Sequence, residues 1–397
     1  MLAEEIQQTL QAGLDAGSAA GPAVGDDATL RERYRQTMFF QCPDRIPNFE
    51  FGYWDETLTS WHGQGLPPEV VDQRSAYRYF GIEDWVTAPI DVMGLRPAFT
   101  EEVLEESDTR VVYRGSEGEV AEINRHGHRS IPHFLRFPVE SRADWERFRE
   151  RLQPVAERVP DNWPQLAAAW RRRALPLAVP IGSLIGRPRN WVGFERIALL
   201  VYDDPAWLED MVETCCQLVC ATLERVLADV EFDFAFGWED ICFNSGPIVG
   251  TACMREIVAP RYRRITDLLR KHGCHIATTD CDGDVRPILD AFAAGGINCL
   301  FPVEVNAGCD PVALRRAHPD LLLHGGFDKM VLTAGPQAIR TELERLAPVV
   351  RAGGFLPGVD HRVQADVALD DYRCYLKLKR VILGVGGEPE YDERAIG

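Results

Sequence analysis

The second half of the chain constrains the fold most, because short apolar runs alternate there with amphipathic stretches of helical periodicity. From Leu175 onward there are six strand-like runs, and nearly every one ends in glycine or polar residues. This alternation is typical of βα units, which build a mainly parallel sheet with helices packed against it. The runs are L-P-L-A-V-P-I-G, F-D-F-A-F-G-W-E-D, H-I-A-T-T-D-C-D-G, C-L-F-P-V-E-V, L-L-L-H-G-G-F-D and F-L-P-G-V-D-H.

Two runs in the first half extend the pattern. I-P-N-F-E-F-G, beginning at Ile46, and the segment Trp85–Val92 bring the strand count to eight. Eight βα units predict a (β/α)8 barrel of the TIM type. A doubly wound open sheet is the alternative, but no G-x-G-x-x-G motif follows an early strand to support it.

Three segments fall outside the barrel pattern. Residues 1–28 read as an amphipathic helix followed by an Ala/Gly/Pro linker, either a mobile tail or a docking arm for a partner subunit. Residues 96–136 contain three strand-like runs separated by turn residues, which predict a small antiparallel insertion. Residues 140–158 and 163–173 read as surface helices. We therefore expect an N-terminal helical extension (1–28) and a single barrel domain (29–397).

Composition narrows the class of function. Among 397 residues the net charge is −18, which opposes binding of nucleic acid or other polyphosphates. No apolar run is long enough to span a membrane, and no signal peptide is evident, so we expect a cytoplasmic protein. The 11 cysteines include no CxxC pair, which indicates reduced thiols and argues against a zinc ribbon.

Polar residues follow the predicted strands, where a parallel barrel gathers its catalytic groups. Several carboxylates and two histidines would then share one mouth, and they repel one another unless a cation, a proton or an arginine lies among them. Glu50 and Asp91 could join from the first half of the chain. The residues in question are Glu239, Asp240, Asp280, Cys281, Asp282, Glu304, His324, Asp328, Asp360 and His361.

Each of these residues also has a structural explanation. Asp282 precedes Gly283 and Asp328 comes two residues after Gly326, so either could be a helix N-cap. His361 could be a satisfied core histidine, and Cys281 an inert buried thiol. Glu304 differs because it lies inside an apolar run, where burying even a neutral unpaired polar group costs roughly 2–7 kcal/mol. Glu304 therefore needs a partner, such as an arginine, a cation or a ligand.

Basic and aromatic residues suggest how a substrate could be held. Arg187 and Arg189, in G-R-P-R-N-W, could bind a substrate carboxylate or lie on the barrel rim. Trp238 is one of several aromatic residues that could line a flat-sided pocket, although large aromatics often belong to the core. We include Tyr53 and Asp328 with these three as candidate substrate-binding residues.

At these residues the chain resembles the uroporphyrinogen decarboxylase superfamily, a barrel family that also contains methyltransferases acting with corrinoid proteins or thiols. The resemblance runs from about Arg31 to Leu383, with weaker support at its start from E-R-Y-R-Q-T-M-F-F-Q-C-P-D-R-I-P. It implies the barrel fold. Its clearest motifs are W-E-D-I-C-F-N-S-G-P-I-V, D-C-D-G-D, G-I-N-C-L-F-P-V-E-V-N-A-G, H-G-G-F-D-K and G-G-F-L-P-G-V-D-H-R-V-Q-A-D-V-A-L-D-D-Y.

The chain departs from two branches of that family. Porphyrin decarboxylases carry R-Q-A-G-R-Y, whereas the corresponding strand here reads N-F-E-F-G-Y-W, which disfavours porphyrin decarboxylation. Corrinoid-linked methyltransferases bind zinc through H-x-C, and here Asp280-Cys281-Asp282 stands at that position. A D-x-D pair with Glu304 or His324 would suit zinc less than a harder divalent cation, or would bind a hydroxylated or basic substrate.

The leading hypothesis is a methyltransferase or demethylase that moves a methyl group between a small methylated compound and a corrinoid or thiol acceptor. Glu239, Asp240, Asp282 and His361 would be the catalytic residues, and a corrinoid protein the partner. The alternative is a decarboxylase of a small carboxylate that needs no cofactor, and a non-catalytic binding barrel is a third possibility. We expect no nucleic-acid or membrane partner and leave a homodimer open.

Overall fold

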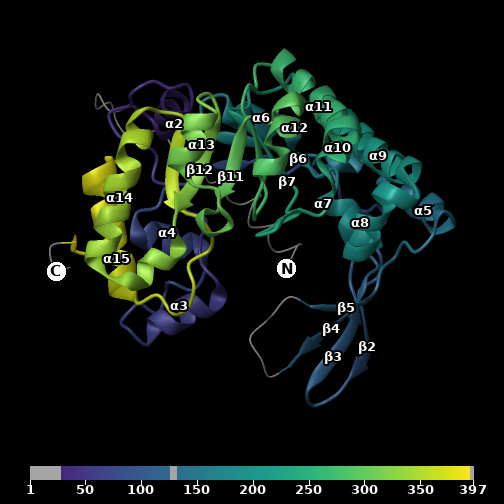
Figure 1. The fold of residues 1–397 in the computed structure, drawn as a ribbon, viewed down its shortest axis with the longest axis horizontal. Coiled ribbons are helices and arrows are strands. Elements are labelled where there is room, and N and C mark those ends of the chain that lie inside the picture. The colour runs from purple at the N-terminus through teal and green to yellow at the C-terminus, as the bar shows by residue number, and fades with distance from the viewer. Residues whose placement is uncertain (1–27, 126–131, 394–397) are drawn as a thin grey trace.

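Seven parallel strands form the central sheet of the computed structural model, which describes residues 28–125 and 132–393. They lie across the sheet in the order in which they occur in the chain. The sheet is curled and helices cover its outer side (Figure 1), which confirms the expected TIM-type architecture. The strands are β1 (Val86–Thr87), β6 (Leu177–Gly182), β7 (Phe234–Trp238), β10 (Ala277–Asp280), β11 (Cys299–Val303), β12 (Leu322–Phe327) and β13 (Phe355–Val359).

The helices between these strands are amphipathic, and α9 (Pro205–Leu223) illustrates why they form. Asp204 caps its first turn by accepting a hydrogen bond from the Trp207 amide at 3.2 Å. Met211, Cys215 and Leu218, spaced at helical intervals, are fully or almost fully buried against the barrel. The other helices after β6 are α7 (Gly186–Val192), α8 (Phe194–Asp203), α10 (Thr251–Cys253), α11 (Ala259–Lys271), α12 (Leu289–Gly295), α13 (Pro311–Ala317), α14 (Pro336–Arg351) and α15 (Leu369–Leu383).

Register places side chains in layers inside the barrel. Thr278 lies opposite Phe236 on β7 and Cys299 on β11, and these three side chains line a small interior cavity. Two residues further along each strand, Asp280 lies opposite Trp238 and Phe301. Because strand side chains alternate with a period of two, this second layer also points inward, nearer the carboxyl ends of the strands. We call that end of the barrel the mouth.

The eighth strand position is filled differently from the prediction. The predicted strand I-P-N-F-E-F-G-Y-W makes only isolated bridges, from Ile46 to Val385 and from Tyr53 to Val363. A side chain replaces the missing backbone ladder beside β13. The Glu50 carboxylate accepts the Val359 amide at 2.9 Å and pairs with Lys379 on α15 at 2.6 Å. This seam between residues 46–53 and β13 is thus held by a buried ion pair.

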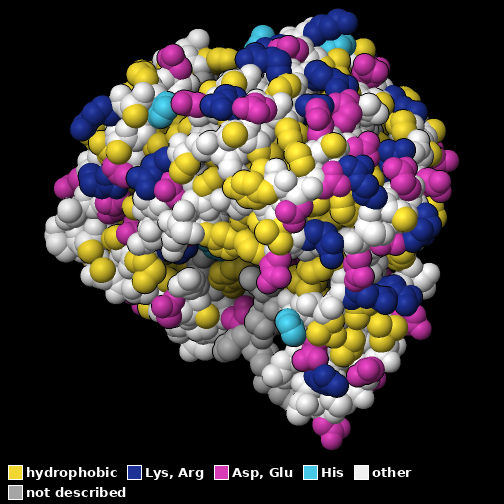
Figure 2. Space-filling model, turned by 45° about the vertical axis from the view of Figure 1, so that its right-hand side comes forward, with side chains coloured by type: hydrophobic (Ala, Val, Ile, Leu, Met, Phe, Trp, Pro, Cys, Tyr) yellow, Lys and Arg dark blue, Asp and Glu magenta, His cyan; other side chains and the backbone are white. Residues whose placement is uncertain are grey.

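The predicted insertion is an antiparallel four-stranded sheet that projects from the barrel as an arm (Figure 1). It consists of β2 (Glu102–Glu106), β3 (Arg110–Arg114), β4 (Val120–Asn124) and β5 (His133–Arg136). Apolar side chains gather on the visible face of the arm (Figure 2), and exposed apolar residues on it include Val103, Phe134 and Leu135. Glu102, Glu105 and Glu106 lie in β2, an edge strand, and their charges oppose pairing with another sheet.

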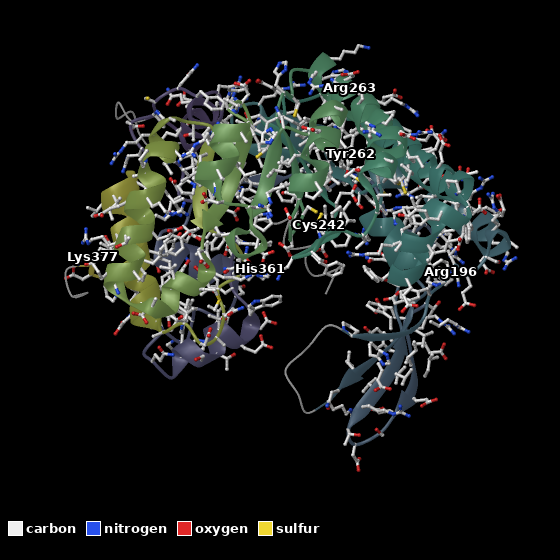
Figure 3. The ribbon with its side chains drawn as sticks, in the orientation of Figure 1. Arg196, Cys242, Tyr262, Arg263, His361 and Lys377 are labelled. Carbon is white, nitrogen blue, oxygen red and sulfur yellow. The ribbon has the colours of Figure 1, made fainter. Side chains whose placement is uncertain are left out.

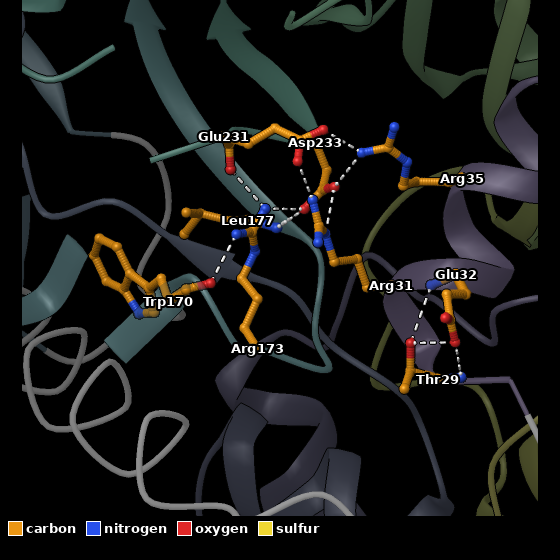
Figure 4. A network of polar contacts seen from close by, with 9 residues as sticks. All are labelled: Thr29, Arg31, Glu32, Arg35, Trp170, Arg173, Leu177, Glu231 and Asp233. Atoms are coloured by element: carbon orange, nitrogen blue, oxygen red, sulfur yellow. Dashed lines mark hydrogen bonds and ion pairs between the residues drawn. The ribbon is translucent and has the colours of Figure 1, made fainter. Parts of the chain in front are cut away.

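Helix α2 (Leu30–Met38) closes the opposite end of the barrel, which we call the closed end. Its capping box at Thr29 and Glu32 fixes where it begins. A network then ties it to the barrel (Figure 4). Asp233 lies immediately before β7. Its carboxylate accepts hydrogen bonds from Arg31 at 2.8 Å, from Arg173 at 2.6 Å and from the Leu177 amide at 2.9 Å.

The remaining sequence expectations have mixed outcomes. The two predicted surface helices are α5 (Arg142–Phe148) and α6 (Trp163–Trp170), and both bury tryptophans, at Trp145 and Trp170, so they are part of the core. Residues 1–27 lie outside the described part of the chain, so the predicted N-terminal helix and linker stay predictions. In the described ranges, no helix has the length and apolar character needed to cross a membrane. Two short helices, α3 (Asp55–His62) and α4 (Gln73–Phe80), follow the seam.

Candidate functional site

The mouth is the candidate site, because four polar side chains from three strand ends converge there. Asp240 follows β7, Asp280 ends β10, Asp282 lies two residues later, and His361 follows β13. Figure 3 shows His361 on the side of the barrel that also carries the arm and α3. All four side chains are half-buried, so each keeps a surface that a ligand could contact.

Asp280 is the most perturbed acid of the mouth. It lies in the inward-pointing layer between Trp238 and Phe301. Among the described residues, no hydrogen-bond donor contacts its carboxyl oxygens. Burial, followed by the charges of Asp282 and Asp240, raises its pKa well above the ordinary value, and only Arg362 opposes this. The carboxyl therefore keeps its proton at a higher pH than an exposed aspartate does.

Asp282 and His361 form a pair across the mouth. Asp282 Oδ2 lies 3.4 Å from His361 Nε2, whereas Asp282 Oδ1 is buried and has no partner among the described residues. The His361 ring stacks on the Trp54 ring, with 5.7 Å between the ring centroids, and its centroid lies 5.2 Å from that of the Phe51 ring. Packing thus fixes the imidazole, while one carboxylate oxygen remains without a donor. The N-cap explanation for Asp282 does not hold, because its oxygens accept no backbone amide among the described residues.

Asp240 adopts a left-handed backbone conformation, with φ of 46°, which is uncommon for a residue other than glycine. Its pKa is raised, mainly by burial and also by the charge of Asp282, against the opposing effect of Arg189. The Arg189 guanidinium donates to the Asp240 backbone carbonyl and lies 3.4 Å from its carboxylate. Asp240 and Arg189, which the sequence predicted separately as a catalytic and a substrate-binding residue, therefore lie on one side of the mouth.

Glu239 does not reach the mouth. Its fully buried carboxylate accepts the Ser183 hydroxyl and the Leu184 amide, at 3.0 and 2.7 Å. It also accepts the Gly186 amide at 2.8 Å and the hydroxyl of Tyr262. An additional Cβ at Gly186 would lie 2.2 Å from the Glu239 carbonyl oxygen. The geometry makes Glu239 an anchor for the loop after β6, and its catalytic role stays a prediction.

Glu304 has the partner that its apolar surroundings require, and the partner is a lysine. Lys329 Nζ lies 2.7 Å from one Glu304 oxygen, and the Gly283 amide donates to the other at 2.9 Å. Nearby, Asp360 accepts the amides of Val305 and Lys329, and burial raises its pKa to about 6. Asp328 caps the 3₁₀ turn that follows β12 by accepting the Met330 amide at 2.9 Å, as its N-cap reading predicts.

The four predicted metal ligands are not brought together. His324 lies in the interior layer below the mouth, where its ring contacts Phe301 at 4.6 Å, and burial lowers its pKa to about 3. Glu304 is occupied by Lys329, which leaves only Asp280 and Asp282 adjacent. Across the described ranges, no three His, Cys, Asp or Glu side chains are grouped so that they could hold a metal ion. The residues present therefore do not fit a bound zinc or a harder divalent cation.

The remaining predicted substrate contacts divide between the mouth and the protein interior. The guanidinium groups of Arg187 and Arg189 lie 5.8 and 5.2 Å from the Trp238 ring. Arg187 also pairs with Glu117 in the β3–β4 turn, so the arm is tied to α7. Tyr53 is buried, and its hydroxyl lies 2.9 Å from that of Tyr372, a position that gives it no access to a ligand.

Sequence reasoning missed Arg362 and Lys329. Arg362 donates to the Tyr53 carbonyl at 3.1 Å, and its guanidinium lies over the rings of Phe51 and Trp54. It follows His361 directly in V-D-H-R, so its place at a strand end was a usable signal. Lys329 ends H-G-G-F-D-K, and the charge of Glu304 in an apolar run was the clue to it.

Comparison with known proteins bears on the fold. No family model and no curated protein matches the chain. A methyltransferase from Methanosarcina mazei superposes with a TM-score of 0.58 and 13% identity, over 89% of this chain and 99% of that chain. The two proteins share a fold. A Penicillium canescens endo-1,4-beta-xylanase, XylE, reaches a TM-score of only 0.32 at 8% identity, over 57% of this chain and 79% of that chain, and adds no argument.

Proposed function

We propose that this protein is a methyltransferase that moves a methyl group from a small methylated compound to a corrinoid or thiol acceptor. The observation that carries the proposal is Asp280, a carboxyl group in an acidic, partly desolvated mouth to which no described residue donates a hydrogen bond. The shared fold with a methyltransferase supports the reaction class. The resemblance of the strand-end motifs to corrinoid-linked methyltransferases supports the acceptor.

The chemistry of methyl transfer explains why such a carboxyl group would be useful. When a nucleophile takes a methyl group from a neutral donor, the atom left behind gains negative charge and must be protonated. A carboxylic acid with a raised pKa holds the required proton. Asp280 would supply it, Asp282 and His361 would orient the donor, and Arg189 and Asp240 would form the opposite wall. A corrinoid, when carried in by a partner protein, supplies the nucleophile that accepts the methyl group.

A decarboxylase is the second candidate, favoured by the two arginines. Arg189 and Arg362 approach the mouth from opposite sides, and either guanidinium could bind a carboxylate. Asp280 could then protonate the carbanion that forms when carbon dioxide leaves. This candidate needs no methyl acceptor, which separates it from the first.

One assay distinguishes the two candidates. The full chain is incubated with either cob(I)alamin or a thiol and a panel of O-, N- and S-methylated acids, and both the methylated acceptor and carbon dioxide are measured. We expect methyl transfer in the wild type and its loss in Asp280→Asn. Carbon dioxide release without any methylated acceptor would overturn the proposal in favour of the decarboxylase.

A further inference from the structure

Two buried thiols from different loops meet beside the mouth. Cys281 lies between Asp280 and Asp282 in the chain, and its side chain is almost inaccessible. The Cys281 thiol is hydrogen-bonded to the thiol of Cys242, which is also buried. Cys242 comes two residues after Asp240. The two sulfur atoms therefore connect the two loops that carry the three acids of the mouth.

Backbone contacts hold these two loops side by side. The Phe243 carbonyl accepts a hydrogen bond from the Asp284 amide at 2.9 Å. Gly283 packs directly against Cys242, since an additional Cβ at Gly283 would lie 2.6 Å from the Cys242 carbonyl carbon. The φ of Gly283 is 81°, a conformation that favours glycine. The approach of the two sulfur atoms is thus fixed by the fold on both sides.

An oxidant could reach Cys242, which Figure 3 labels, through the hairpin that it begins. Strand β8 (Cys242–Phe243) pairs with β9 (Gly246–Pro247) over only two positions. Pro247, which lies opposite Cys242, has no N–H to donate to this pairing. Phe243 is 52% exposed, and residues 244–245 are exposed as well. An element with so few backbone hydrogen bonds opens locally at low cost, so Cys242 is the thiol that an oxidant meets first.

Helix α9 carries a second pair of thiols, which shows what is special about the first. Cys216 and Cys220 are hydrogen-bonded to each other, one turn apart on the same helix. A covalent bond between them would join two groups that the helix already holds together. A bond between Cys242 and Cys281 would instead join two loops that can otherwise move independently.

We propose that Cys242 and Cys281 are an oxidative modification site, at which hydrogen peroxide converts the two thiols into a reversible disulfide that ties the hairpin to the loop after β10. The Cys242 sulfur attacks one peroxide oxygen, the O–O bond breaks, and a sulfenic acid and one water form. The Cys281 sulfur then displaces the hydroxyl group, so the S–S bond forms and a second water leaves. The two thiols lose two electrons and two protons, and the peroxide takes up both. This inference does not rest on the proposed function.

The disulfide would change the mouth in a measurable way. Hydrogen-bonded sulfur atoms lie well beyond the S–S bond length of about 2.05 Å, so the two loops must move toward each other. Asp280 and Asp282 flank Cys281 and move with it. The hairpin can then no longer open away from the loop, so we expect the amides of residues 242–247 to exchange with solvent at least about tenfold more slowly.

Peptide mapping tests whether the bond forms. The full chain is treated with hydrogen peroxide, the remaining thiols are blocked, and tryptic peptides are fragmented by mass spectrometry before and after addition of dithiothreitol. We expect a link between Cys242 and Cys281 that dithiothreitol removes. Free thiols at both positions after oxidation would overturn the proposal. A link from Cys242 to Cys309 would also overturn it, because the Cys309 thiol lies nearby and donates to the Gly283 carbonyl at 3.5 Å.

A matched pair of variants assigns the effect on the hairpin. Cys242→Ser removes one thiol of the pair, whereas Cys253→Ser removes a comparably buried thiol on the same tryptic peptide. Hydrogen exchange is measured on the oxidised and reduced forms of each protein. We expect oxidation to slow exchange of residues 242–247 in the wild type and in Cys253→Ser, and to leave it unchanged in Cys242→Ser. Slower exchange in oxidised Cys242→Ser would overturn the proposal.

These measurements are separate from any test of methyl transfer. The thiol and cob(I)alamin acceptors of the proposed reaction are reductants that would break the disulfide, so turnover is not the readout. A linked protein whose hairpin exchanges at the reduced rate would show that the bond ties nothing, and the inference would fail. Absence of methyl transfer in the reduced protein would overturn the proposed function and leave the disulfide to be decided by the peptide map.

Discussion

The two ends of the barrel treat a buried aspartate in opposite ways. At the closed end, Asp233 is surrounded by donors, including two arginines and a backbone amide. At the mouth, Asp280 faces two other carboxylates, and no donor among the described residues contacts its oxygens. The same side chain is therefore part of the scaffold at one end and a chemically reactive group at the other. The difference lies in the neighbouring groups, which are hydrogen-bond donors around Asp233 and carboxylates around Asp280.

The largest expected effect is on activity, in Asp280→Asn. Removing a positioned general acid lowers the rate by about 10²–10⁴-fold. Because asparagine resembles the protonated carboxyl group, the free energy of unfolding should change by less than about 0.5 kcal/mol when it is measured below the ordinary pKa of aspartate, where the carboxyl is protonated in both states. Methyl-transfer rates and urea denaturation measure the two quantities. A variant that transfers methyl groups at the wild-type rate would show that Asp280 is not the acid.

The rate should also depend on pH in a defined direction. An acid acts only while protonated, so activity falls as pH rises through the raised pKa of Asp280. The free energy of unfolding should also fall as pH rises, because the folded state holds this proton more tightly than the unfolded state does. The contribution of Asp280 is therefore lost as pH rises from its ordinary pKa to the raised one. The free energy of unfolding is measured by urea denaturation at several pH values for wild type and for Asp280→Asn. It should depend less on pH in the variant.

At the closed end, Arg173→Met should leave Asp233 buried with its charge less compensated. Breaking a buried ion pair from one side costs about 3–5 kcal/mol, and Asp233 and Arg173 are both almost inaccessible. We expect a correspondingly lower free energy of unfolding in urea. Asp280→Asn serves as the matched change at the mouth. Equal losses of stability in the two variants would remove the contrast between the two ends.

Glu239→Gln tests whether Glu239 is an anchor or a catalyst. Glutamine offers one acceptor oxygen where the carboxylate offers two, so at least one buried donor in the 183–186 loop loses its partner, at a cost of about 1–3 kcal/mol. We expect a lower melting temperature and a modest loss of activity, with the pH profile unchanged. A shifted pH profile with normal stability would instead give Glu239 a direct part in proton transfer.

The smallest effect is expected on the arm. Arg110 pairs with Glu105 and Glu122, but its side chain is half exposed. Exposed ion pairs contribute about 0–1 kcal/mol, so Arg110→Ala should barely change the free energy of unfolding. A loss of unfolding free energy comparable with that of Arg173→Met would mean that the number of ion pairs, and not their burial, determines stability here.

The sequence predicted the architecture better than the site. Alternation of apolar runs located β6, β7 and β10–β13, because burial on both faces leaves a strong local signal. It failed at residues 46–54, where a side chain of Glu50 replaces a backbone ladder, and hydrophobic periodicity cannot encode that exchange.

Site prediction failed where position depends on tertiary packing. The mouth acids Asp240, Asp280 and Asp282 were found because strand ends share one face of a barrel. His324 lies only three residues into β12 and so lies below the mouth, and Glu239 turns into the 183–186 loop. Neighbouring residues of a strand point to opposite faces of the sheet, one to the interior and one to the exterior. A list of strand-end residues does not tell these two orientations apart.

The seam at Glu50 has a consequence for synthesis of the chain. Glu50 and Lys379 are 329 positions apart, so the contact that closes the barrel joins almost the first and last described elements. A ribosome must release nearly the whole polypeptide before this closure can occur, and until then the parallel sheet has an open edge at β13. Such long-range closure slows folding and exposes an edge to other chains. Truncations that remove α15 should therefore accumulate as aggregates during expression, even though the mouth residues would all be present.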